Sequence, residues 1–162
     1  MSREHGAPPR HVPDATTRYD ALTGLPSRDE ILALITAELD NRSADSHCSV
    51  LLVDIDGFRE FNDALGPATG DDLLRLIADR LTSSLRPGDT IGRLAGDEFV
   101  VIARRCHSIA ARAMAAGFAS VFEPAFELGD RQLTLTASVG VASSTDADIS
   151  ATQLVHNATA AM

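Results

Sequence analysis

Apolar residues follow two different periods along this chain, and the change between them predicts alternating helices and strands. Over residues 28–41 the apolar positions recur every three or four residues, as they do on one face of a helix. Residues 49–55 instead form an almost continuous apolar run that ends in carboxylates, which is typical of a buried central strand. We therefore predict a first helix over 28–41 and a first strand over 49–55.

Capping and turn residues mark the remaining helices. Ser27 followed by Glu30 has the spacing of a capping box, which places the start of the first helix at residue 28. Gly66-Pro67 is expected to end a short second helix, and Thr69-Gly70-Asp71 to cap a third. The helices predicted after the first cover residues 58–65, 71–85, 109–122 and 150–162, and the chain end cuts off the last of them.

The other predicted strands have apolar runs or strict alternation. Two β-branched runs, 91–94 and 99–103, flank the tight polar centre Ala95-Gly96-Asp97-Glu98 and predict a β-hairpin. Alternation over 132–141 predicts one more strand. The order of these elements predicts an α+β domain over 18–162, with a mostly antiparallel central sheet and flanking helices, close to a ferredoxin-like arrangement. Residues 1–17 lack periodicity and are expected to be a disordered leader or linker.

Composition narrows the classes of function. The chain has 162 residues and a net charge of −9, which argues against a surface that tracks DNA or RNA phosphates. An acidic protein can still bind a nucleotide when a metal ion lies between its carboxylates and the phosphates. We expect no nucleic-acid partner, no membrane segment and no signal peptide, and we expect Cys48 and Cys106 to be free thiols in a reducing cytoplasm.

Two carboxylates carry the candidate chemistry. Asp54 lies at the end of the first strand, and Asp97 lies on the hairpin turn beside Gly96, where a phosphate can approach the backbone closely. If the two strands are neighbours, both carboxylates lie at one edge of the sheet and can share Mg²⁺, which takes few protein ligands. The alternative is an ordinary polar hairpin turn.

The helix over 58–65 begins close to Asp54, so its N-terminal amides would point toward a triphosphate bound to the same ion. Asn62 and Asp71 lie on polar faces just beyond. An amide and a carboxylate can read a guanine edge, because the carboxylate accepts from N1–H and N2–H₂ while the amide reaches O6 or N3.

Several stretches in this order and spacing together resemble a GGDEF domain of the diguanylate cyclase family. They are YDALTGLPSR, LLVDIDGFREFNDALG, GDDLL, LRPGDTIGRLAGDEFVVI and LTASVGVA, from about Tyr19 to the end of the chain. The resemblance implies the palm fold of nucleotidyl cyclases. It also implies a homodimer that holds one GTP in each subunit and joins the two into cyclic di-GMP with release of pyrophosphate.

The resemblance also implies roles for single residues. Asp54, the Ile55 carbonyl and Asp97 would bind Mg²⁺, with Mn²⁺ as an alternative ion, and Asp97 would activate the 3′-hydroxyl. The residues that would contact GTP are Asn62 and Asp71 at the guanine, with Phe58, Arg59 and Gly96 near the phosphates. Arg86 and Asp89 form an R-x-x-D pattern that matches the inhibitory site for the product.

The sequence departs from the family pattern at several positions. Ala95 replaces the first glycine of the motif, and an alanine there would be strained if the position required a positive φ. Pro67 stands where the family usually has His, Arg59 replaces a lysine, and Thr159 replaces an acid in the last helix. The lysine expected soon after Thr159 to hold phosphates is not in the chain.

These departures keep a second function open, in which a catalytically degenerate domain acts as a receptor for GTP or cyclic di-GMP. A purely structural dimerisation module is also open, although it explains none of the paired carboxylates. A calcium loop at Asp54-Ile-Asp56-Gly does not fit, because Gly57 comes too early and Phe58 occupies a ligand position. Sensor or effector domains are expected elsewhere in the full-length protein, which we expect in the cytoplasm.

Overall fold

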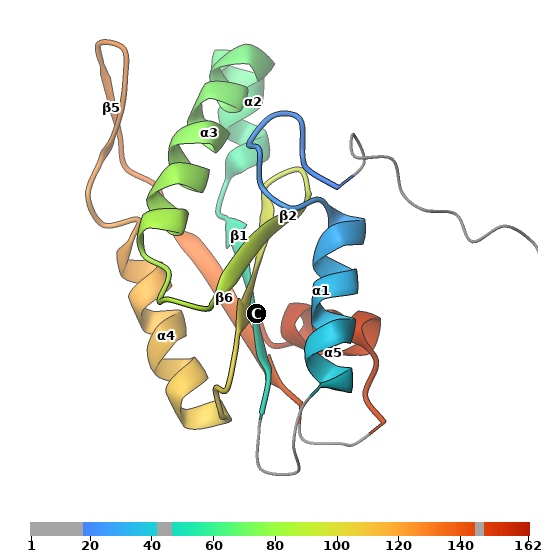
Figure 1. Ribbon diagram of the computed structural model, residues 1–162. Coiled ribbons are helices and arrows are strands. Elements are labelled where there is room, and N and C mark those ends of the chain that lie inside the picture. The colour runs from blue at the N-terminus through green and yellow to red at the C-terminus, as the bar shows by residue number, and fades with distance from the viewer. Residues whose placement is uncertain (1–17, 42–46, 145–147) are drawn as a thin grey trace, which may run out of the picture.

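In a computed structural model, which describes residues 18–41, 47–144 and 148–162, a four-stranded antiparallel sheet lies between two layers of helices (Figure 1). The leader predicted over 1–17 lies outside the described residues. The strands of this sheet are β1 (Ser49–Ile55), β2 (Thr90–Ala95), β3 (Glu98–Ala103) and β6 (Ala137–Ser143). The helices are α1 (Arg28–Asp40), α2 (Phe58–Leu65), α3 (Pro67–Ser83), α4 (Ser108–Ser120) and α5 (Ala151–Ala160).

The strand order is β2-β3-β1-β6, and each neighbouring pair is antiparallel. This is the order of a ferredoxin-like sheet, in which the first and third strands lie at the centre. The α+β prediction and the hairpin predicted around residues 95–98 are therefore confirmed. Both cysteines are buried, and they form no disulfide.

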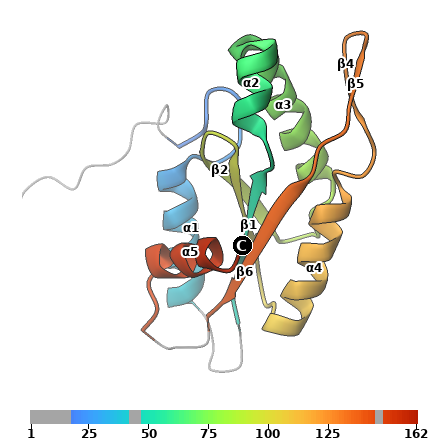
Figure 2. The same cartoon turned by 180° about the vertical axis from the view of Figure 1, so that it is seen from behind.

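Helices cover both faces of β1, which explains its continuous apolar run. Leu51, Val53 and Ile55 pack into one core together with α3 and α4. Val50 and Leu52 face the opposite way and pack into a second core with α1 and α5. The two views show the same layers, with α1 and α5 on one side of the sheet and α4 on the other (Figures 1 and 2).

The start of the third helix differs from the prediction. Helix α3 begins at Pro67, so Thr69-Gly70-Asp71 lie inside the helix and do not cap it. Proline is favoured at the first position of a helix because its fixed φ is already helical and its missing N–H has no partner there anyway. Gly70 has a packing role instead, since a Cβ at this position would overlap the Asn62 amide of α2.

The strand predicted over 132–141 is interrupted. Residues Arg131–Leu133 (β5) pair with Phe126–Leu128 (β4) in a separate small hairpin, and β6 begins only at Ala137. Periodicity did not reveal the break, because both strands continue the same alternation. At the base of this hairpin, Arg80 of α3 donates to the Pro124 carbonyl (2.6 Å) and the Ala125 carbonyl (2.9 Å), and its guanidinium lies 3.6 Å from the centre of the Phe126 ring.

Gly140 of β6 packs directly against the last helix, and this contact predicts a large cost for a methyl group. A Cβ at position 140 would overlap the Ala158 carbonyl of α5 and lie 2.7 Å from Met162 Cγ. We expect Gly140→Ala to lower the free energy of unfolding in urea by about 1–3 kcal/mol. In Gly117→Ala the new Cβ would meet no atom within 4 Å, so this helical control should gain about 0.5–1 kcal/mol. Equal effects of the two changes would contradict the packing argument.

Candidate functional site

A cluster of carboxylates gathers where β1 meets the β2–β3 hairpin. The strand register pairs Asp54 with Glu98, and Asp97 lies in the turn immediately before Glu98. Burial raises the pKa of the Asp54 carboxyl, and the charges of Asp97, Glu98 and Asp56 raise it further. Burial and repulsion both disfavour the charged form of Asp54, and a cation bound among these carboxylates would offset the repulsion.

Asp56 belongs to a different set of contacts from Asp54. Its carboxylate accepts hydrogen bonds from Thr136 Oγ1 (2.6 Å) and Ser138 Oγ (2.8 Å), and its N–H donates to the Thr136 carbonyl (3.0 Å). Within the described part of the chain, the carboxylates of Asp54 and Asp97 accept no hydrogen bond. The two predicted metal-binding carboxylates are thus available to a ligand, whereas Asp56 is bonded to the start of β6.

Ile55, predicted to contribute its carbonyl, is the last residue of β1, and its side chain is buried in the core. Only the backbone of Ile55 is therefore available to a ligand. In the described residues, no group of three or more His, Cys, Asp and Glu side chains is arranged to hold a metal ion. The site offers two carboxylates and a backbone oxygen, which suits an ion that takes its remaining ligands from substrate and water.

The hairpin turn itself is free of the strain that Ala95 could have introduced. Gly96 has a positive φ of 53°, so the second glycine of the motif is needed for the turn. Ala95 is the last residue of β2, and among the described non-glycine residues only Arg105 has a positive φ. The alanine at the first motif position therefore adopts an ordinary strand conformation.

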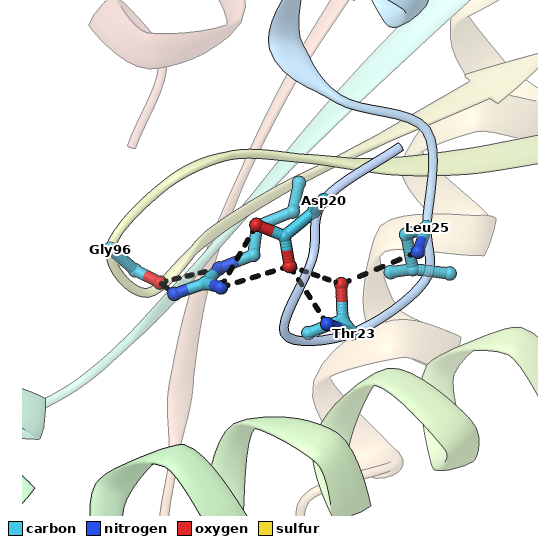
Figure 3. A network of polar contacts seen from close by, with 5 residues as sticks. Asp20, Thr23, Leu25 and Gly96 are labelled. Atoms are coloured by element: carbon cyan, nitrogen blue, oxygen red, sulfur yellow. Dashed lines mark hydrogen bonds and ion pairs between the residues drawn. The ribbon is translucent and has the colours of Figure 1, made fainter. Parts of the chain in front are cut away.

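Arg93 fixes this turn from one side, and sequence reasoning gave it no role. Its guanidinium donates to the Gly96 carbonyl through Nε (2.9 Å) and Nη2 (2.7 Å), and Nη1 donates to the Asp20 carboxylate. Thr23 in turn holds Asp20 through its N–H and hydroxyl (Figure 3). The sequence signals for this network are the position of Arg93 just before the motif and the Tyr19–Arg28 stretch.

Helices α2 and α3 bring the two predicted guanine contacts together. Asn62 packs against Gly70, and Asp71 follows Gly70 on the exposed side of α3. The Asn62 Oδ1 atom is buried without a hydrogen-bond partner among the described residues. Phe58, the first residue of α2, is buried and stacks on Phe61, while Arg59 is exposed.

The predicted inhibitory pair lies beyond the other end of β2. Arg86 Nε donates to Asp89 Oδ2 at 3.0 Å, and this bond raises the pKa of the Arg86 guanidinium. Asp89 also accepts the Arg104 N–H (3.1 Å), and its side chain is only 3% exposed. The pair lines a cavity of about 560 Å³ with His47, Arg104 and Arg105 among its other walls.

Comparison with known proteins decides the family. Residues 17–162 match the model of a family described as "Diguanylate cyclase, GGDEF domain". The chain belongs to the GGDEF family. A crystal structure of a sensory box/GGDEF family protein from Caulobacter crescentus has a TM-score of 0.82 and 30% identity, over 89% of this chain and 94% of that one.

Named relatives of this GGDEF domain include proteins with opposite activities. The GGDEF domain of TpbB from Pseudomonas aeruginosa, a protein named as a diguanylate cyclase, has a TM-score of 0.81 and 33% identity over 88% of this chain and 85% of that one. The cyclic di-GMP phosphodiesterase NbdA of the same species is 37% identical over 76% of this chain and 16% of its own length.

This GGDEF domain spans only about a fifth of the length of the first curated relatives that it matches. The activity and partners of those whole proteins therefore remain proposals for this chain. No helix in the described ranges combines the length and apolar character needed to cross a bilayer.

The raised pKa of Asp54 predicts a pH-dependent stability. An acid whose pKa is higher in the folded state than its ordinary value of 3.8 destabilises the fold once it ionises, so this destabilisation is present at neutral pH and disappears in acid. We expect Asp54→Asn to raise the free energy of unfolding of the metal-free protein at pH 7. The difference from wild type should narrow as the pH falls.

Urea unfolding in EDTA at several pH values measures this effect. Asp130→Asn, which removes an exposed carboxylate at the tip of the β4–β5 hairpin, is the matched control and should change little. If Asp54→Asn destabilised the protein at pH 7, the repulsion inferred within the carboxylate cluster would be wrong.

Proposed function

We propose that this GGDEF domain is a diguanylate cyclase, which condenses two GTP molecules into cyclic di-GMP and pyrophosphate. The observation that carries the proposal is the carboxylate cluster at the β2–β3 turn, where Asp54 pairs with Glu98 beside Asp97, and where burial and these charges raise the pKa of Asp54. Without a cation, such a cluster destabilises the fold. A bound cation with its phosphates would offset the repulsion. The reaction would take place in the cytoplasm, where GTP is available.

The residues present fit Mg²⁺, with Mn²⁺ as an alternative. The available donors are all oxygens: the carboxylates of Asp54 and Asp97, which accept no hydrogen bond from described residues, and the backbone carbonyl of Ile55. Hard oxygen donors in small number match an ion that also binds substrate phosphates. Bound there, the ion would neutralise phosphate charge and make the attacking hydroxyl more acidic.

GTP recognition is assigned to α2 and α3. The buried Oδ1 of Asn62 leaves the amide NH₂ as the group available to a ligand, and this donor suits O6 or N3 of guanine. The exposed Asp71 carboxylate would accept from N1–H and N2–H₂. The backbone at Phe58 and Gly96 and the exposed Arg59 side chain would contact the phosphates, with Asp97 accepting the proton of the 3′-hydroxyl.

Joining two GTP molecules requires two of these sites to face each other. A homodimer with two-fold symmetry provides that arrangement, because each subunit then presents the same residues to its partner. Since the chain spans about a fifth of the first curated relatives, sensor or effector domains of the full-length protein would control how the two domains meet.

A receptor for GTP or cyclic di-GMP is the second candidate function. Pro67 at the start of α3 favours it, since this position lacks the side chain that the family usually supplies. The argument from Ala95 is weaker, because that residue is unstrained in β2. Turnover distinguishes the two functions directly.

Incubating the protein at high concentration with GTP and Mg²⁺ should yield cyclic di-GMP, measured by chromatography, and ATP should yield no cyclic product. We expect Asp97→Asn to lower the rate by about 100-fold or more, because the variant loses a metal ligand and the acceptor of the hydroxyl proton. Asp130→Asn, with its exposed carboxylate far from the turn in sequence, should retain the wild-type rate.

The contradicting outcome is binding without turnover. If GTP or cyclic di-GMP bound but neither this chain nor one extended beyond Met162 formed product, the domain would be a receptor. Full turnover by Asp97→Asn would remove Asp97 from the catalytic site while leaving the cyclase activity itself established.

We also propose that cyclic di-GMP binds back at Arg86 and Asp89. The buried Asp89 carboxylate orients the Arg86 guanidinium in the wall of the cavity that Arg104 and Arg105 also line, where it can pair with a phosphate or a guanine edge. Arg86→Ala should raise the concentration of cyclic di-GMP needed for half inhibition by about tenfold, equal to about 1.4 kcal/mol. Arg112→Ala, an exposed arginine of α4, should leave it unchanged. Unaltered inhibition in Arg86→Ala would place product feedback elsewhere.

A further inference from the structure

The peptide group between Gly96 and Asp97 has a fixed orientation. Its carbonyl accepts two hydrogen bonds from one guanidinium, from Arg93 Nε (2.9 Å) and Nη2 (2.7 Å). The bond is trans, as are all peptide bonds among the described residues. In a trans peptide the N–H points opposite to the carbonyl, so the N–H of Asp97 points away from Arg93.

The strand register shows which side of the sheet this N–H faces. Arg93 pairs with Phe99 and lies on the face packed against α3 and α4. Asp54 pairs with Glu98, and both lie on the opposite face, which continues Leu52 and Val100. The Asp97 N–H therefore points toward the side that carries Asp54, and outside the strand ladders of the described residues it donates no hydrogen bond.

The turn alone would not hold this orientation. Glycine tolerates positive and negative φ almost equally, so the peptide after Gly96 could rotate and turn its carbonyl toward Asp54. A carbonyl oxygen in that position would repel a phosphate, whereas an N–H would donate a hydrogen bond to it. The two hydrogen bonds from Arg93 to the Gly96 carbonyl favour one of these two orientations.

Arg93 is itself held by the entering segment, residues 18–26, which precedes α1. Its Nη1 lies 3.2 and 3.0 Å from the two Asp20 carboxylate oxygens, and its side chain is only 12% exposed. Burial alone would raise the pKa of Asp20, but hydrogen bonds from Thr23 and Arg93 lower it, so the carboxylate stays charged. The Arg93 N–H also donates to the Pro26 carbonyl (2.9 Å), which ties β2 to the same segment.

We propose that Arg93, held by Asp20, is a positioning residue that keeps the Asp97 N–H directed at a phosphate of the bound nucleotide. The inference rests on the proposed nucleotide site but not on turnover, so it applies equally to a cyclase and to a receptor. It assigns Asp97 a second contact with the ligand, through its backbone, beside the role of its carboxylate.

Nuclear magnetic resonance of the ¹⁵N-labelled chain tests the proposal without requiring catalysis. On addition of a non-hydrolysable GTP analogue with Mg²⁺, the Asp97 amide proton should move downfield, as expected for a new hydrogen bond to phosphate. Shifts of the Asn62 and Asp71 amide signals would show that the analogue binds. If these signals shifted and the Asp97 amide signal did not, the proposal would be overturned.

Substitutions at Arg93 give the second readout. Arg93→Met should weaken binding of the Mg²⁺–GTP analogue by about tenfold in calorimetry and abolish the Asp97 shift, while binding of cyclic di-GMP at Arg86 stays unchanged. Arg93→Lys keeps the charge but lacks the planar fork that reaches Gly96 and Asp20 together, so it should restore only part of the affinity. Asp20→Asn should give an intermediate loss.

Arg18→Met is the matched control, because Arg18 lies in the same entering segment but pairs with Glu30 instead of the turn. It should bind the analogue as wild type does. Wild-type affinity and a normal Asp97 shift in both Arg93 variants would refute the positioning role. If the wild-type protein formed no cyclic di-GMP but still showed the Asp97 shift, only the proposed catalysis would be refuted.

Discussion

The two-sided burial of β1 is the constraint on which the rest of the molecule depends. Its neighbours β3 and β6 bond to both of its edges, and helices cover both of its faces. A slip of one residue would exchange the two faces and bury Asp54 in a core, so the register is strongly determined. The pairing of Asp54 with Glu98 and Ser138 follows from that register, and with it the position of the carboxylate cluster.

Strand β2 separates the two candidate sites at opposite ends of the sheet. Asp97 lies in the turn at one end of β2, and Arg86 and Asp89 lie just before its other end. Six residues of strand at about 3.3 Å each separate these groups by roughly 20 Å. The two candidate sites are thus connected through a single hairpin.

The fold could be predicted from sequence because it depends on local patterns, and the same patterns place Asp54 and Asp97 at one edge of the sheet. The continuous apolar run predicts β1, and the two β-branched runs on either side of Gly96 predict the β2–β3 hairpin. The network of Asp20 and Arg93 could not be predicted, since it joins residues 73 positions apart through side-chain geometry. The local pattern around Gly70 predicts a cap and misses its packing role, because its contact with Asn62 depends on how two helices pack.

The conformation of the turn shows which of the two glycines in the family motif the backbone requires. Position 95 has an ordinary strand geometry, so natural selection can replace its glycine with alanine at little conformational cost, whereas position 96 has a φ of 53° and tolerates such drift poorly. A search pattern that demands glycine at both positions would miss chains whose turn has the backbone conformation seen here. In this chain the shape of the turn depends on the second glycine and on the arginine three residues before it.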